Sequence, residues 1–232
     1  NKKAITKDRI KVDVMCNLEL SEEVKLLNDS SDGVGLFRTE YLYMNRDDTP
    51  TEHEQYQAYS KVFKKVNGKP VTLRTLDIGS DKEVSENMKV GQIAKNPALG
   101  MRGIRYSLYE KNLFKIQIKA MLRAAKNGKL RILIPMITTL DEINKAKDLI
   151  DEAKTELIKE KKSFNPRYEV GIMIEVPASA IQSNVLSKNV DFMSIGTNDL
   201  VQYILAIDRV DDEVTSLYDP TNPAVLQLIK QV

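Results

Sequence analysis

The chain is poor in cysteine, in histidine and in long apolar runs. Its 232 residues include one cysteine, Cys16, and one histidine, His53. A lone cysteine excludes an internal disulfide and is typical of a reducing, cytoplasmic compartment. Apolar runs such as residues 132–137 are far too short to span a bilayer, and the polar start of the sequence does not resemble a signal peptide. These absences predict a cytoplasmic protein with no membrane partner.

An excess of charge of either sign is also lacking. Lys and Arg number 35 against 33 Asp and Glu, which gives a formal net charge of +2. Such a balance gives no reason to expect a nucleic acid or an anionic membrane surface as partner. Hydrophobic residues at 42% and charged residues at 29% are typical of a soluble globular domain. The length suits one large domain or two small ones, and α/β barrels routinely reach it as a single domain.

Six short apolar runs alternate with longer amphipathic stretches. We predict strands at residues 12–18, 33–39, 71–77, 131–137, 170–176 and 192–197. We predict helices at residues 21–28, 52–66, 111–126 and 141–160, and a long loop at residues 78–102. Near-continuous apolar strands indicate a parallel sheet covered on both faces. The repeated strand–helix units favour such a sheet, either closed as a barrel or open and doubly wound.

Polar residues cluster where the predicted strands end. They are Arg38, Glu40, Arg74, Asp77, Glu175, Asn198 and Asp199. The carboxyl ends of parallel strands lie on one side of a sheet, where α/β enzymes build their sites. Glu175 and Asp199 would share a Mg²⁺ ion, because this ion prefers one or two protein carboxylates. Arginines at the same edge would bind a phosphate, since the guanidinium fork matches its oxygens.

Five segments carry a resemblance to a known family. They read GVGLFRTEYL (33–42), LRTLDIGSDK (73–82), NPALGMRGIR (96–105), IEVPA (174–178) and SIGTNDLVQY (194–203), and Asp208-Arg209 follow. In this order they resemble the phosphoenolpyruvate (PEP)-binding barrel of enzyme I of the bacterial sugar phosphotransferase system, from about residue 12 onward. Ser80 stands where that family usually has a glycine, and we expect only local adjustment there.

The resemblance implies a fold and an extent. The fold would be an α/β (β/α)₈ TIM barrel, with residues 1–232 forming the C-terminal PEP-binding domain and about six of the eight strand–helix units present. The N-terminal domains of the family, which carry the phospho-accepting histidine and bind its carrier protein, would be absent. The family's proton-donating cysteine would lie beyond Val232. We interpret Cys16 as a small core residue of the first strand and His53 as a surface residue.

The resemblance also assigns roles to residues of the chain. The residues implied to bind PEP are Arg38, Arg74, Arg102, Asn198, Asp199 and Arg209. Glu175 and Asp199 would hold the Mg²⁺ cofactor. The family transfers the PEP phosphoryl group to a protein histidine and releases pyruvate, which is the first step of sugar uptake by this system. No catalytic residue of that transfer is expected within this chain.

Partners follow from the same resemblance. The family forms a homodimer through this barrel, and its histidine-containing carrier protein contacts the absent N-terminal half. Two alternatives stay open: a barrel of the pyruvate phosphate dikinase or PEP synthase type, and a non-catalytic PEP-binding dimerisation module. For the isolated chain we expect PEP binding without turnover.

Overall fold

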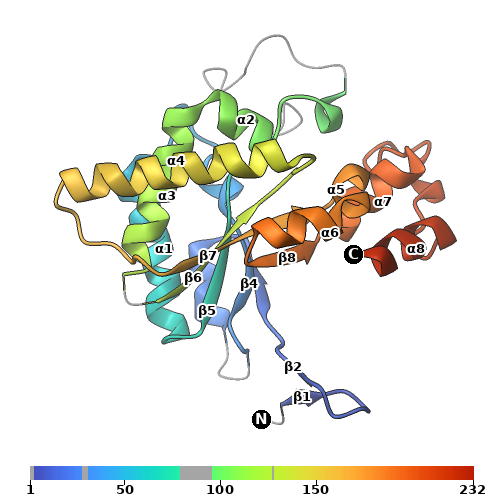
Figure 1. Cartoon of the computed structure of the whole chain (residues 1–232), viewed down its shortest axis with the longest axis horizontal. Coiled ribbons are helices and arrows are strands. Elements are labelled where there is room, and N and C mark those ends of the chain that lie inside the picture. Colours follow the sequence, from blue (N-terminus) through green and yellow to red (C-terminus); the bar gives the residue numbers. More distant parts are fainter. Residues whose placement is uncertain (1–2, 28–30, 79–95, 127) are drawn as a thin grey trace.

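The computed structural model describes residues 3–27, 31–78, 96–126 and 128–232, and its centre is a six-stranded parallel sheet (Figure 1). The strands are β3 (Cys16–Leu18), β4 (Val34–Arg38), β5 (Pro70–Arg74), β6 (Lys129–Ile134), β7 (Tyr168–Ile174) and β8 (Phe192–Ile195). Their order in the sheet is their order in the chain. In a doubly wound sheet the order of the strands reverses near the centre of the sheet, whereas in a barrel each strand lies beside the one before it in the chain. The order confirms the predicted α/β fold of the (β/α)₈ TIM barrel type, with six parallel strands.

Three long helices cover one face of this sheet. They are α1 (Glu52–Val66), α3 (Lys111–Ala124) and α4 (Leu140–Lys159), which follow β4, β5 and β6. The short helix α2 (Ile104–Tyr109) precedes α3 directly. Capping boxes begin two of the long helices, Thr51 with Glu54 on α1 and Thr139 with Glu142 on α4. The Thr139–Glu142 box sets the start of α4 at Leu140, one residue before the predicted start at residue 141.

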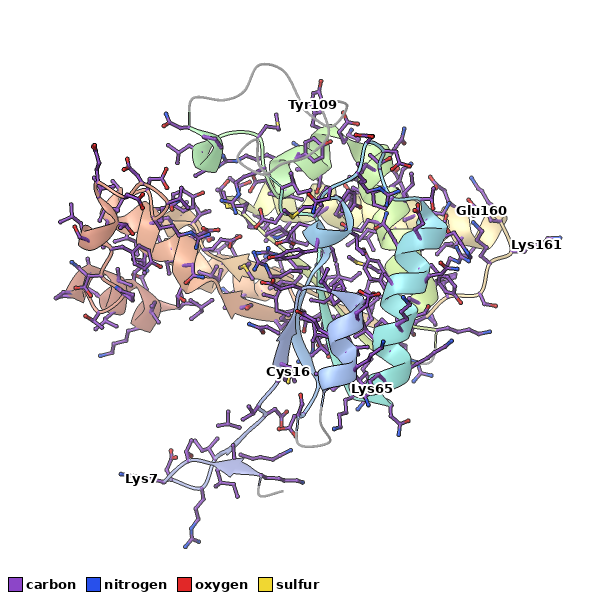
Figure 2. All side chains as sticks on the ribbon, turned by 180° about the vertical axis from the view of Figure 1, so that it is seen from behind. Lys7, Cys16, Lys65, Tyr109, Glu160 and Lys161 are labelled. Atoms are coloured by element: carbon purple, nitrogen blue, oxygen red, sulfur yellow. The ribbon has the colours of Figure 1, made fainter. Side chains whose placement is uncertain are left out.

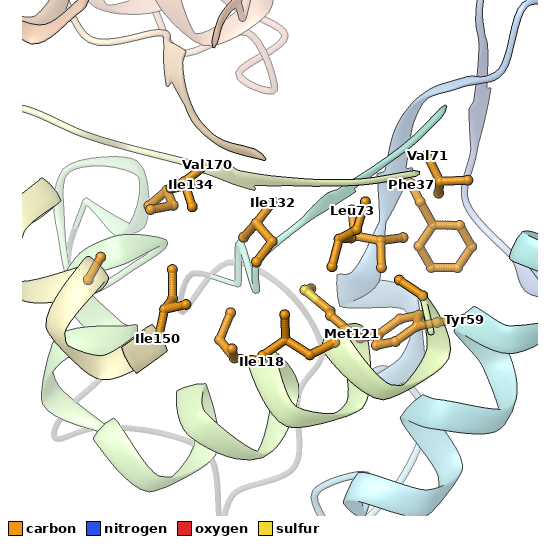
Figure 3. Close-up of a cluster of buried hydrophobic side chains, with 14 of the residues drawn as sticks. Phe37, Tyr59, Val71, Leu73, Ile118, Met121, Ile132, Ile134, Ile150 and Val170 are labelled. Atoms are coloured by element: carbon orange, nitrogen blue, oxygen red, sulfur yellow. The ribbon is translucent and has the colours of Figure 1, made fainter. Parts of the chain in front are cut away.

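The main hydrophobic core lies between the sheet and these helices. Figure 3 shows Leu73 of β5 and Ile132 of β6 pointing from the strands toward Ile118 and Met121 of α3. All four side chains are fully buried. Because side chains alternate along a strand, the residues between them point to the other face of the sheet. This other face carries Arg74 on β5 and the buried Leu133 on β6, so it mixes polar and apolar side chains, whereas the face toward the helices is apolar.

The C-terminal helices lie beside β8, away from the three long helices (Figure 1). They are α5 (Pro177–Ile181), α6 (Ser183–Leu186), α7 (Thr197–Leu205) and α8 (Pro223–Gln231). α8 packs on α5 and α7, and the Asn222 side chain caps its first turn. Short 3₁₀ turns fill several connections. They are η1 (Ser21–Leu26), η2 (Thr39–Leu42), η4 (Pro97–Leu99), η5 (Ser187–Asn189) and η6 (Thr215–Leu217).

The first predicted strand is wrong in its extent. Residues 12–18 do not form one strand, because Lys11–Val12 is strand β2 of a separate antiparallel hairpin with β1 (Ala4–Ile5). Between the two, the backbone of Val14 bonds to Asp32 and not to a neighbouring strand. Figure 2 shows Lys7 at the tip of this hairpin, well away from the sheet. Cys16 is half-buried, which corrects the prediction that it packs in the core.

Other sequence predictions hold with small shifts, except that the predicted helix over residues 21–28 is the 3₁₀ turn η1 over Ser21–Leu26, with residue 28 outside the described part of the chain. The predicted helix 111–126 ends at Ala124, and the predicted helix 141–160 is Leu140–Lys159. Within the predicted loop 78–102, Pro97–Leu99 forms a 3₁₀ turn, and Ser80 lies outside the described residues. His53 is exposed on α1, as predicted. Among the helices that the structure describes, none has the length and apolar character needed to cross a membrane.

Candidate functional site

The predicted site residues gather at the carboxyl ends of the strands. Arg38 and Arg74 are the last residues of β4 and β5, and they are direct partners in the register of the sheet. Glu175 directly follows β7, and Asp199 lies in the first turn of α7 after β8. Arg102 precedes α2 and reaches the same edge through its contact with Asp199. The parallel topology therefore brings together residues up to 161 positions apart.

The charged groups of this edge form one continuous row of alternating sign. In order they are Glu19, Arg38, Glu40, Arg74, Asp77, Arg102, Asp199 and Arg209. Each inner carboxylate bridges two arginines. Asp77 Oδ2, for example, lies 3.1 Å from Arg74 Nη1 and 3.0 Å from Arg102 Nη2. We call this set the arginine–carboxylate row.

Burial increases toward the centre of the row. The side chains of the two outermost arginines, Arg38 and Arg209, are 33% and 39% exposed, whereas Arg74 and Arg102 are buried. Burial alone would lower the pKa of both guanidinium groups, but nearby carboxylates outweigh it and raise the pKa. Asp77 and Glu40 do this for Arg74, and Asp77 and Asp199 do it for Arg102. Both arginines therefore stay charged at any physiological pH.

One donor at the centre of the row is unused. Arg74 Nε is buried and makes no hydrogen bond in the part of the chain that the structure describes. Such a group costs free energy unless something accepts its hydrogen bond. An anion bound against Arg74 would satisfy it. The unused Nε can therefore donate to one oxygen of a bound phosphate or carboxylate.

Three carboxylates lie close together beside the row. Oxygens of Asp77, Glu175 and Asp199 all fall within 4.8 Å of one another, and the three side chains are buried. Burial, followed by the nearby charges of Asp77 and Asp199, raises the pKa of Glu175 to about 8. Buried carboxylates at this spacing repel each other unless a proton or a cation neutralises them.

This donor set fits Mg²⁺. Oxygen donors from two strand ends are the ligands that this ion selects. Oδ1 of Asp199 is buried and makes no hydrogen bond among the described residues, although it lies 3.2 Å from Arg209 Nη2. Oε1 of Glu175 accepts a hydrogen bond of 2.7 Å from the backbone N–H of Met136, which holds this carboxylate in place beside the cluster. Glu175 and Asp199 are thus placed to hold the ion together.

Gly196 makes room for Glu175. A Cβ at this position would lie 2.8 Å from Glu175 Cβ and 2.9 Å from its Oε2. No ordinary side chain fits at such distances, so the glycine between β8 and α7 is what lets the two carboxylates converge. Its role depends on a contact 21 residues away in the chain, which no local pattern reports.

The structure brings most, but not all, of the predicted residues into contact. Arg38, Arg74, Arg102, Asp199 and Arg209 join the row, and Glu175 joins the carboxylate cluster. Asn198 is exposed, and its backbone carbonyl accepts a hydrogen bond of 3.2 Å from the Tyr218 hydroxyl. A substrate contact of Asn198 therefore remains a prediction.

Sequence reasoning noted Glu40 and Asp77 at strand ends but did not place them in the binding set. Both bridge pairs of arginines in the row. The available signal was their position, two or three residues beyond an arginine that ends a strand.

A cavity of about 1300 Å³ lies at the opposite end of the strands from the row. It is lined by Lys129, Arg131 and Glu169 among others, and it shares no residue with the row.

Comparison with known proteins gives the family. The PEP-binding domain of PEP-utilising enzymes matches residues 1–232. The chain is 45% identical over 233 residues to a phosphoenolpyruvate-protein phosphotransferase of Priestia megaterium, covering all of this chain and 40% of the relative. It is 44% identical to that of Bacillus subtilis (strain 168), with the same coverage, and 45% identical over 229 residues to that of Geobacillus stearothermophilus, covering 98% of this chain and 39% of the relative.

The chain thus spans about two fifths of the length of these curated relatives. The match over all 232 residues agrees with the row of arginines and the carboxylate cluster at the strand ends. The chain belongs to the PEP-utilising enzymes, as a PEP-binding domain of that family.

Proposed function

We propose that this chain binds PEP together with Mg²⁺ at the carboxyl ends of its strands. The observation that carries the proposal is the meeting of the arginine–carboxylate row with the cluster of Asp77, Glu175 and Asp199. PEP carries a phosphate and a carboxylate close together, so it offers oxygens to the arginines and to a shared cation at once. Bound Mg²⁺ would supply neutralising charge for the phosphoryl group as it leaves.

The residues of the row give a reason for the two ligands to bind together. Asp199 occupies donors of both Arg102 and Arg209. When Asp199 turns to a cation, these guanidinium groups gain free donors for phosphate oxygens. Conversely, a phosphate that takes those donors leaves Asp199 free for the cation. Each ligand therefore removes a competitor of the other, and their affinities should be coupled in both directions.

We extend this proposal to the reaction of the named relatives. The phosphoryl group would pass to a protein histidine with release of pyruvate, in a cytoplasmic homodimer of the sugar phosphotransferase system that works with a histidine-containing carrier protein. The acceptor would not be His53, which lies exposed on α1 and contacts Gln57 and Tyr56. On its own, the chain would thus bind PEP without turning it over.

A calorimetric titration tests the proposal. We expect PEP to bind the chain in the presence of Mg²⁺ and at least tenfold more weakly without it. Arg74→Ala should weaken binding by tenfold or more, because a charge-assisted hydrogen bond contributes about 1.5–3 kcal/mol. Arg131→Ala is the matched control, since Arg131 lies toward the amino ends of the strands, away from the site. It pairs with Glu169, and its guanidinium group lies over the ring of Phe192.

The outcomes separate clearly. Mg²⁺-dependent binding that Arg74→Ala loses and Arg131→Ala keeps would support the site. A folded chain that binds no PEP, or equal losses in the two variants, would overturn it.

A further inference from the structure

The segment 74–77 carries two members of the arginine–carboxylate row on a strand end that is leaving the sheet. Arg74 pairs with Leu133 of β6, and the N–H of Thr75 still donates to the Leu133 carbonyl at 2.9 Å. The next amide, that of Leu76, lies beyond this ladder. A buried backbone N–H needs a partner, so something other than the sheet must hold the chain here.

Gln117 of α3 provides that partner. Its Oε1 accepts a hydrogen bond of 2.9 Å from the N–H of Leu76. Its Nε2 donates at 3.1 Å to Thr39 Oγ1, and the Thr39 hydroxyl donates at 2.7 Å to the carbonyl of Arg74. The side-chain amide of Gln117 cannot be flipped to exchange its oxygen and nitrogen. The N–H of Leu76 requires an acceptor, and the Thr39 hydroxyl already donates its proton to the Arg74 carbonyl, so it needs a donor from Gln117.

One side chain therefore fixes the segment at two points. Gln117 holds Leu76 directly and Arg74 through Thr39. Both points come just before Asp77, whose carboxylate accepts a hydrogen bond from Arg102. Gln117 and Thr39 are both fully buried. An amide in such a core is costly unless its hydrogen bonds are made, and an apolar side chain would pack there without them. Packing alone does not account for a glutamine at this position.

We propose that Gln117, acting with Thr39, is a positioning residue of the PEP site that sets Arg74 and Asp77 relative to the other arginines. The inference rests on the proposed PEP binding and names a residue outside the row. Displacements of about 1 Å in a binding group can change function by two orders of magnitude, so supporting hydrogen bonds of this kind control affinity without touching ligand.

Gln55 supplies a matched control. It is also a fully buried glutamine, and its Oε1 accepts from the hydroxyls of Tyr43 and Tyr59 while its Nε2 donates to the Pro50 carbonyl. None of these groups lies in segment 74–77. Gln55 is linked to Gln117 one step away, through the Tyr59 hydroxyl, which accepts a long hydrogen bond of 3.4 Å from Gln117 Nε2. Gln55→Met and Gln117→Met both break buried hydrogen bonds, so both should lower the midpoint of urea unfolding.

The experiment compares PEP affinity in the presence of Mg²⁺ by calorimetry, under conditions where each variant is folded. We expect Gln117→Met to bind PEP about tenfold or more weakly than wild type, and Gln55→Met to stay within about twofold. Hydrogen exchange at the Leu76 amide should become faster in Gln117→Met and stay unchanged in Gln55→Met.

Thr39 keeps the inference testable if Gln117→Met does not fold. Thr39→Val keeps the shape and loses the hydroxyl, so it should weaken PEP binding, whereas Thr39→Ser restores the bond to the Arg74 carbonyl and should restore affinity. If wild type binds PEP but Thr39→Val matches Thr39→Ser, or Gln117→Met matches Gln55→Met, the positioning role is wrong. If wild type itself binds no PEP, it is the proposed function that fails.

Discussion

At the scale of single residues, Glu175 is the group whose ionisation decides what the site can hold. Burial and the charges of Asp77 and Asp199 raise its pKa to about 8, whereas its ordinary value is 4.5. The folded, cation-free chain therefore holds a proton on Glu175 at pH 7 that the unfolded chain has lost. The stabilisation from this protonated group is fully present below pH 4.5 and is lost as the pH rises through about 8.

This proton must leave when a cation binds. We expect the affinity for Mg²⁺ to rise between pH 7 and pH 9, because less work is needed to deprotonate Glu175 at the higher pH. At pH 7 the binding of one ion should release about one proton, and above pH 9 almost none. Calorimetric titrations in two buffers of different ionisation enthalpy measure this release.

Glu175→Gln provides the comparison for the proton release. It removes the titrating group at nearly constant shape, so its weaker Mg²⁺ binding should lose this pH dependence. Proton release in wild type that does not change between pH 7 and pH 9 would show that Glu175 is not the group displaced.

The sequence reveals those site residues that lie at strand ends, but not those that act through contacts with distant parts of the chain. Arg74 and Glu175 could be predicted because parallel strands carry their ends to one edge, and the strands themselves are plain in the apolar pattern. Gln117 and Gly196 could not be predicted, because each matters through a contact with a distant part of the chain. Helical spacing places Gln117 on the apolar face of its helix, four residues from Leu113 and from Met121, but it does not show that the partner is the amide of Leu76.

At the scale of elements, Glu52 ties together the helices that cover the sheet. It begins α1, and its carboxylate pairs with Arg123 of α3 and with Lys162 just after α4. Lys119 of α3 lies 3.4 Å from the same carboxylate. Burial by itself would raise the pKa of Glu52, but these cations outweigh it and lower the pKa below 4.5. The ionised form is therefore the one that joins the three helices.

Replacing Glu52 should cost stability in a pH-dependent way. We expect Glu52→Gln to lower the free energy of unfolding by about 1 kcal/mol at pH 7, as for a partly exposed network of ion pairs. Because the pKa of Glu52 is lowered by folding, the contribution is fully present above pH 4.5 and is lost as the pH falls through the folded pKa. Urea unfolding at pH 7 and at pH 3 measures the difference.

Glu22→Gln is the control for the helix network. Glu22 of η1 pairs with Lys61 of α1, the helix that Glu52 begins, but both side chains are more than half exposed. Its replacement should change the free energy of unfolding by only a few tenths of a kcal/mol. Equal effects of the two substitutions would show that Glu52 does not hold the helices together.

Elements differ in how far the sequence predicts them. The helices over residues 52–66 and 141–160 could be predicted because four or more turns repeat the apolar spacing. α2 has six residues, too few for a period to show, and it was missed. The β1–β2 hairpin was missed as well, since its strands of two residues each leave no alternation to read.

At the scale of the whole molecule, one face of the sheet forms the hydrophobic core and the ends of its strands carry the site. One face packs on α1, α3 and α4 and supplies most of the buried apolar surface. The strand ends supply the site, which draws on β4, β5, β7 and α7. Since strands on both sides of the sheet's centre contribute, the geometry of the site depends on the packing of the whole domain.

The β1–β2 hairpin stands apart from this arrangement. Among the described residues, its hydrogen bonds stay within residues 4–12, and its large apolar side chains are open to solvent, with Ile5 62% and Ile10 59% exposed. A segment that buries so little apolar surface contributes little to the free energy of unfolding. Asp13 and Val14 lie past the hairpin, where Val14 is tied to Asp32.

Removing residues 1–12 should therefore leave the domain intact. We expect the free energy of unfolding to change by less than about 0.5 kcal/mol, whereas Leu18→Ala, in the buried part of β3, should cost about 2–4 kcal/mol. Urea unfolding of both variants beside wild type makes the comparison, and PEP affinity should not change on deletion. A loss above about 1 kcal/mol, or a change in the number of chains per particle by sedimentation, would mean that the exposed Ile5 and Ile10 are covered in solution, by this chain or by a second copy.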